Sequence, residues 1–208
     1  MKGLIFSEPM VKVWLEGNKT VTRRLMNPQP LERSQYGGMN IYGQAIFYPP
    51  DDLEDTDDSC LRKPRYLPGE TVYIKETWAH VSVPDGTTAR KNIIVYKADN
   101  PQGVCVPNMW KSPRFMPERF SRSHALIVSV RPERVKEIGF DELLKEGLEV
   151  DTEARYVFNE DGVPIDCYPE PDPSTLLDQF VTLWESLHPG SWERNDWVWR
   201  NELEWRER

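Results

Sequence analysis

The chain has 208 residues, of which 38% are hydrophobic and 29% are charged, and its formal net charge is −8. This length fits one domain with insertions or two small domains, and it is enough to bury a hydrophobic core. No apolar run approaches the ~18 residues of a membrane-spanning helix, and the acid at Glu8 comes too early for a signal peptide, so we expect a cytoplasmic protein with no membrane partner.

The N-terminal residues predict a short strand followed by a short helix. Leu4–Phe6 is typical of a buried strand, and Ser7 is placed to cap the next helix, with Pro9 in its first turn. Apolar residues then recur at helical spacing, and Gly17 is a natural C-terminal stop. The segment after Gly17 is therefore expected to be positioned by a packed helix.

That segment, Lys19–Arg24, holds a lysine, two threonines and two arginines. If it is extended, Thr22 and Arg24 share one face, and Lys19 and Arg23 share the other. A lysine near a hydroxyl can activate an oxygen nucleophile, or it can hold an anion such as phosphate. A solvated strand edge that carries surface charge also accounts for the pattern, so both interpretations stay open.

Two acidic segments, at about residues 27–63 and 149–172, have the composition of insertions. The first is rich in Pro, Gly, Asp and Tyr, and a small hairpin is expected in it around Ala45–Tyr48. Residues 51–58 carry six acids and no base, and the second segment carries eight acids and one base, Arg155. Without residues 51–58 and 149–172, the chain has 25 basic and 20 acidic residues, which is compatible with a nucleotide or polyanion partner.

Further along the chain, Thr71–Trp78 alternates like a half-buried strand and places Glu76 and Trp78 on its buried side. A glutamate on such a face needs a partner, and an arginine of the framework would suffice. Residues 92–98 predict another strand. Basic and aromatic residues then interleave through Met109–Arg122, which includes Arg114. This mixture suits either base stacking with phosphate contacts or a loop clamped to the core by its aromatic rings.

The C-terminal half predicts two strands and two helices. Ala125–Val130 is a strong strand, and a short amphipathic helix after it ends at Gly147. Glu146 lies in the last turn of that helix, where a carboxylate opposes the helix dipole. A longer amphipathic helix begins near Pro173, and Trp197–Trp205 alternates as a final strand with one apolar side.

The cysteines and histidines do not form the spacing of a metal site or a disulfide framework. We expect the thiols to be reduced, and we expect no metal and no cofactor. The six residues are Cys60, Cys105, Cys167, His80, His124 and His188. Separated strands with a few short helices favour an α+β fold, namely a small, mostly antiparallel barrel formed by one domain over residues 1–208.

The order of the motifs adds a resemblance to a known family. The series is Gly-Asn-Lys-Thr-Val-Thr-Arg-Arg, Leu-Pro-Gly-Glu, Lys-Glu-Thr-Trp, Trp-Lys-Ser-Pro-Arg-Phe-Met-Pro, Val-Arg-Pro-Glu-Arg-Val-Lys-Glu-Ile, Leu-Lys-Glu-Gly and Pro-Gly-Ser-Trp. Outside the two insertions, the chain resembles the ASCH domain family in the longer form often seen in phages and prophages. This resemblance implies a barrel similar to the PUA fold of RNA-modifying enzymes.

The small bacterial ASCH enzymes that hydrolyse N4-acetylcytidine use a Lys-Thr-x-Thr segment and a downstream glutamate. The resemblance therefore implies that Lys19, Thr22 and Glu146 are catalytic in an amidohydrolase that acts on a modified nucleoside. The expected roles are a partly neutral Lys19 as base toward Thr22 or a water held by it, and Glu146 as proton relay to the leaving nitrogen. The candidate substrate-binding residues are Arg23, Arg24, Glu76, Trp78 and Arg114.

Two other functions fit the same pattern. A module that binds RNA or nucleotides, or that cleaves RNA in the same cleft, would have a continuous basic groove lined by Arg114, Arg119 and Arg122. A protein-interaction domain would instead leave Lys19 in solvent and expose an apolar patch. A hydrolase should hold the Lys19 amine and the Thr22 hydroxyl ~2.6–3.2 Å apart, or one water apart.

Overall fold

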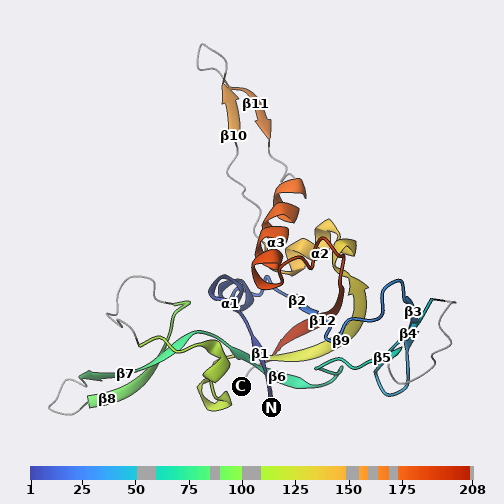
Figure 1. The fold of residues 1–208 in the computed structure, drawn as a ribbon. Helices are drawn as coiled ribbons and strands as arrows, with labels where there is room; N and C mark the ends of the chain where they lie inside the picture. The colour runs from blue at the N-terminus through green and yellow to red at the C-terminus, as the bar shows by residue number, and fades with distance from the viewer. Residues whose placement is uncertain are drawn as a thin grey trace.

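The computed structural model describes residues 1–50, 60–84, 90–99, 109–148, 155–158, 164–168 and 173–206. Its centre is a five-stranded sheet in the order β1-β6-β9-β12-β2 (Figure 1). The strands are β1 (Lys2–Ile5), β2 (Val21–Leu25), β6 (Thr71–Lys75), β9 (His124–Arg134) and β12 (Trp197–Arg206). β1 pairs in parallel with β6, and the other pairs of this sheet are antiparallel.

The remaining described strands form three smaller antiparallel sheets. These are β3 (Gln35–Met39) with β4 (Ala45–Tyr48) and β5 (Leu61–Arg62), β7 (Trp78–Pro84) with β8 (Arg90–Tyr96), and β10 (Arg155–Phe158) with β11 (Pro164–Tyr168). The hairpin predicted around Ala45–Tyr48 is confirmed by the pairing of β3 with β4. The pair β10–β11 lies within the second acidic segment, where the composition did not predict strands.

Three α-helices flank the central sheet: α1 (Glu8–Leu15), α2 (Phe140–Lys145) and α3 (Pro173–Leu187). Gly17 and Gly147 follow α1 and α2 with φ of +83° and +85°, the left-handed conformation that ends helices. Ser7 is the N-cap of α1 but makes no capping hydrogen bond, contrary to the sequence prediction, and lines a cavity. None of the helices in the described ranges is long and apolar enough to cross a membrane.

Three short 3-10 turns complete the helical elements of the described chain. They are η2 (Pro113–Phe115), η3 (Glu118–Phe120) and η4 (Val135–Glu137). The first two lie inside the basic and aromatic segment, which therefore folds as tight turns. The mixed α+β class with mostly antiparallel sheets is confirmed.

The pairing of the described strands does not close the central sheet into a barrel. β1 and β2 are its two outer strands, and within the described residues no backbone ladder joins them. A side chain bridges the two strands instead, because Nη2 of Arg24 on β2 donates to the carbonyl of Ile5 on β1 at 2.6 Å. Helix α1 connects β1 to β2 in the sequence, so it starts next to β1 and ends next to β2.

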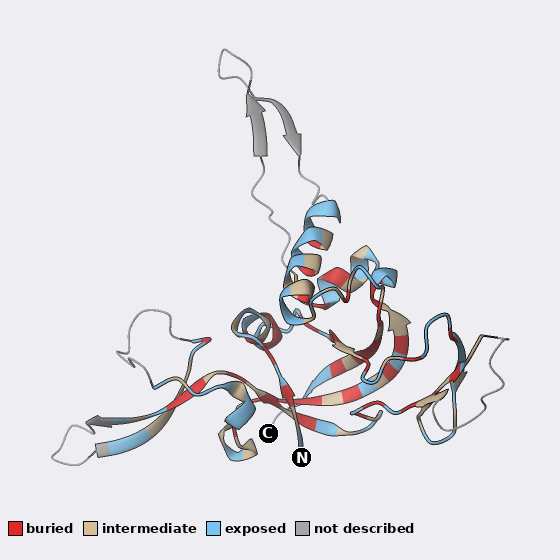
Figure 2. Cartoon of the chain, viewed as in Figure 1, coloured by how far each residue is buried: buried red, intermediate tan, exposed pale blue. Residues whose placement is uncertain are grey.

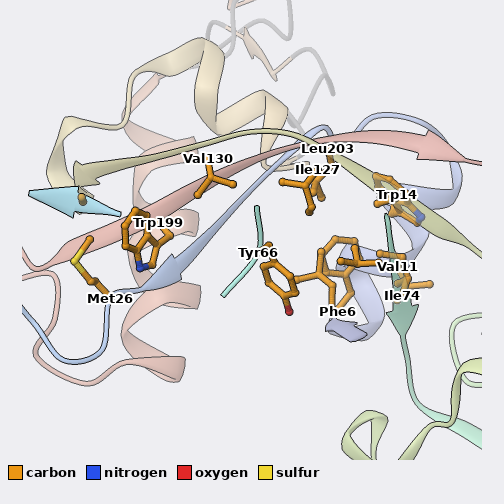
Figure 3. Close-up of a cluster of buried hydrophobic side chains, with 14 of the residues drawn as sticks. Phe6, Val11, Trp14, Met26, Tyr66, Ile74, Ile127, Val130, Trp199 and Leu203 are labelled. Atoms are coloured by element: carbon orange, nitrogen blue, oxygen red, sulfur yellow. The ribbon is translucent and has the colours of Figure 1, made fainter. Parts of the chain in front are cut away.

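Two apolar cores pack against opposite faces of the central sheet, as neighbouring residues of β12 show. Val198 belongs to the core under α2 and α3, and Trp199 belongs to the larger core under α1. Figure 3 shows the larger core, and Figure 2 shows that buried residues are concentrated along the central strands. The larger core includes Leu4, Phe6, Val11, Trp14, Met26, Ile74, Ile127, Trp199 and Leu203; the smaller one includes Val135, Leu143, Leu176, Phe180 and Trp184.

The central strand β9 offers a matched pair of neighbours for a stability test. Ile127 is fully buried, whereas Val128 is 45% exposed. We expect Ile127→Ala to lower the free energy of unfolding by about 2–5 kcal/mol, because it leaves a cavity in the larger core. Val128→Ala should cost less than about 1 kcal/mol. Urea unfolding at neutral pH measures both values, and equal losses would contradict this core assignment.

Candidate functional site

Lys19 is a buried lysine that follows α1 and immediately precedes β2. The residue is only 1% exposed. Glu16 is the one acidic residue near it in the sequence. Its Nζ donates to Oε2 of Glu146 at 2.7 Å and to the carbonyl of Glu146 at 2.6 Å. Burial lowers the pKa of Lys19, and the negative charge of Glu146 opposes part of that change.

Glu146 is held at the end of α2 by two cations from one short segment. Its Oε2 accepts the Lys19 bond, and its Oε1 accepts a bond from Nη1 of Arg23 at 3.0 Å. Gly147 permits this approach, because a Cβ there would lie 2.7 Å from Cγ1 of Val13 and 3.2 Å from Cβ of Lys19. The glycine therefore ends the helix and also lets it pack closely against the lysine.

Each of the three guanidinium nitrogens of Arg23 donates a hydrogen bond to a carboxylate. Its Nε donates to Glu133 at 2.6 Å, and its Nη2 donates to Glu142 at 3.0 Å, in addition to the bond to Glu146. Arg200 on β12 binds the two oxygens of Glu142 at 2.7 and 3.0 Å. The hydrogen bonds from Arg200 lower the pKa of Glu142 to about 2, against a desolvation effect that raises it. This network joins α2 to β2, β9 and β12.

Thr22 and Arg24 lie on the opposite face of β2 from Arg23. Thr22 is fully buried, and its Oγ1 accepts a hydrogen bond from Nη1 of Arg24 at 3.0 Å. Within the described residues no direct hydrogen bond joins Lys19 to Thr22. The sequence predicted that the side chains of Lys19, Thr22 and Glu146 lie in one region. In the structure the direct contact that forms is between Lys19 and Glu146.

A cavity of about 150 Å³ is lined by residues of α1, β2, α3 and the end of α2; we call it the α3 cavity. Its wall is mostly apolar, with a few ionisable groups, as is usual for ligand pockets. Lys19 and Thr22 lie behind the wall, next to Glu146 and Arg24, which line it. The lining residues are Ser7, Pro9, Met10, Arg23, Arg24, Glu146, Gly147, Leu148, Phe180, Leu183, Trp184, Leu187 and His188.

Sequence reasoning missed the contribution of α3 to this cavity. Phe180 and Trp184 belong to the apolar stripe that was interpreted as core packing, and both are indeed buried in the smaller core. The same stripe also forms the cavity wall, and its period alone cannot separate the two uses. His188, just beyond α3, has its pKa lowered by burial and then by the charge of Arg24.

Three other candidate residues lie outside the lining of the α3 cavity. Glu76 receives two bonds from Arg122, both at 2.8 Å, so it has the framework arginine that the sequence left as an alternative. Trp78 is 4% exposed and packs its ring against Phe120, with its centroid 5.0 Å away. Arg114 is exposed on η2. The structure does not bring these three to Lys19, and their role in substrate binding stays a prediction.

The low pKa of Glu142 makes the stability of the protein depend on pH. The folded pKa of about 2 lies below the ordinary value of 4.5, so this carboxylate stabilises the fold above pH 4.5, and the contribution is lost as the pH falls toward 2. We expect the free energy of unfolding to fall less between pH 7 and pH 3 in Glu142→Gln than in the unaltered protein. The exposed Glu204→Gln is the control, and urea unfolding is the measurement. Parallel pH dependences in all three proteins would contradict the network.

Comparison of the chain with protein-family models, with curated proteins and with solved structures yields no match. The family resemblance therefore stays a prediction, and the function has to be argued from the geometry of the site.

Proposed function

We propose that the chain is a member of the ASCH domain family with a PUA-like barrel, and that it hydrolyses the N4-acyl amide of a modified cytidine or related nucleoside in the cytoplasm. The observation that carries this proposal is the buried contact between Lys19 and Glu146, two residues 127 positions apart in the sequence, at the wall of the α3 cavity. In support of the barrel, Arg24 bridges the outer strands β1 and β2.

The size and wall of the α3 cavity suit one small ring. Its volume of about 150 Å³ matches that of apolar protein cavities that accommodate benzene. Phe180 and Trp184 supply aromatic surface to the wall. A pyrimidine base is close to benzene in size, so the cavity fits the cytosine ring of the proposed substrate.

Hydrolysis of the acyl amide requires a nucleophilic oxygen, an acceptor for its proton and a donor for the leaving nitrogen. In the proposed reaction, the Glu146 carboxylate accepts a proton from water as the water oxygen attacks the acyl carbon. The bond from that carbon to N4 then breaks, and Glu146 returns the proton to N4, which leaves as the amine of cytidine. The acyl group departs as a carboxylic acid, which loses its proton to solvent and becomes a carboxylate.

Lys19 acts in this proposal through Glu146. Its ammonium lies 2.7 Å from Oε2, and burial lowers its pKa, so Lys19 gives up a proton more readily than an exposed lysine does. Lys19 also fixes the carboxylate in one orientation, together with Arg23. Thr22 holds Arg24 in place from behind the wall.

The alternative of a nucleic-acid-binding groove has less support. Arg122 is committed to Glu76 and also to Asp99, with bonds of 2.7 and 2.6 Å to the latter, so it is not free to neutralise a phosphate. The Trp78 ring is buried and offers no open face for base stacking. One of the three arginines that the groove requires is therefore used for ion pairing within the protein.

The catalytic proposal predicts that Glu146→Gln and Lys19→Met each lower the rate of N4-acetylcytidine hydrolysis about 100-fold or more, because each removes a member of the buried catalytic pair. Lys12→Met, an exposed lysine on α1, should keep the unaltered rate. Cytidine released over time is measured by liquid chromatography with mass spectrometry, and thermal unfolding of each variant separates loss of fold from loss of chemistry. Absence of cleavage by the unaltered protein, or full activity in a folded Lys19→Met, rules the proposal out.

A further inference from the structure

Arg24 lines the α3 cavity but makes no ion pair with any described residue. Its Nη1 donates to Oγ1 of Thr22 at 3.0 Å and to the carbonyl of Arg23 at 2.9 Å, and its Nη2 donates to the carbonyl of Ile5 at 2.6 Å. All three acceptors are neutral. A guanidinium has five N–H donors, so the Nε–H and one Nη2–H remain without a partner in the described part of the chain.

In two other arginines, the edge of the guanidinium formed by Nε and Nη2 binds a carboxylate. Arg122 donates from Nε and Nη2 to the two oxygens of Glu76, and Arg200 donates from Nε and Nη2 to the two oxygens of Glu142. This two-point arrangement matches the geometry of carboxylate and phosphate groups. At Arg24 the Nε–H of this edge has no partner among the described residues, and Nη2 has one further hydrogen besides the one donated to Ile5. No protein anion of the described chain fills this edge.

The charge of Arg24 is compensated only in part, by the nearby Glu146, which makes no hydrogen bond with it. Burial lowers the pKa of Arg24, but a guanidinium stays protonated in proteins, so the cost of desolvation remains. The nearby Glu146 already binds Lys19 and Arg23 with its two oxygens. Arg65 adds further positive charge close to Arg24. An anion that enters from solvent would offset this excess.

From this unfilled edge we infer that Arg24 binds the phosphate of a nucleoside 5′-monophosphate whose base occupies the α3 cavity. A phosphomonoester carries nearly two negative charges at neutral pH, whereas a carboxylate carries one. The phosphomonoester therefore suits an arginine with a second arginine nearby better than a single carboxylate does. The identity of the base rests on the proposed function, whereas the anion site does not. A free nucleotide is favoured over an RNA strand because the cavity has room for one ring between α1, α2 and α3.

Binding of three probes to the full chain tests this inference. Isothermal titration with cytidine 5′-monophosphate, cytidine and the dinucleoside monophosphate CpC should give the tightest binding for the first. Arg24→Lys keeps the charge but loses the two-point edge, and it should weaken binding of the monophosphate about tenfold or more while changing cytidine binding little. Arg206→Lys, at an exposed arginine outside the cavity, is the matched control and should bind as the unaltered protein does.

The outcomes separate this inference from the proposed hydrolysis. Equal binding of cytidine and its monophosphate by the unaltered protein overturns the anion site, whether or not Arg24→Lys folds. Equal binding of CpC and the monophosphate overturns the assignment to a free nucleotide. Loss of monophosphate binding in Arg206→Lys, but not in Arg24→Lys, places the anion elsewhere. Tight monophosphate binding without any cleavage of N4-acetylcytidine keeps the anion site and removes the hydrolase.

Discussion

The buried ion pair between Lys19 and Glu146 is the interaction on which the rest of the site depends. It joins the segment before β2 to the end of α2, and Arg23 completes it from the same segment. Removing one partner of such a pair typically costs 3–5 kcal/mol, because the other charge is left buried without compensation. The pair therefore holds the C-terminal end of α2 in position against the segment before β2. This position defines one wall of the α3 cavity.

Alternation along β2 separates two sets of charged contacts. Arg23 points toward α2 and meets three carboxylates, whereas Arg24 points to the other face and meets only neutral acceptors. The first arginine holds the helix against the sheet through Glu142 and Arg200. The second bridges the outer strands β1 and β2 and keeps an unfilled edge beside the cavity. Two adjacent arginines thus have a structural role and a proposed ligand-binding role.

Much of the fold follows from patterns in the sequence. The spacing of apolar residues and the two glycines predicted α1, α2 and their ends, and the alternation in Trp197–Trp205 predicted the strand β12. The expectation of a single apolar side was wrong for β12, because Val198 on the other face is fully buried and Trp205 is exposed. Whether the sheet closes into a barrel was not predictable, because closure depends on which outer strands approach each other rather than on any local period. The strands β10 and β11 were missed because acidic composition masked a short pairing.

The candidate site was predictable in part. The meeting of Lys19 with Glu146 followed from the resemblance, but the role of Phe180, Trp184 and His188 in the cavity did not, since a core stripe and a cavity wall look alike in sequence.

The most direct test of the account is the pKa of the Lys19 amine, measured by nitrogen-15 NMR with and without cytidine. The account predicts a value below the ordinary 10.5 and a resonance that shifts when cytidine fills the cavity. An ordinary pKa and a resonance indifferent to cytidine would contradict it.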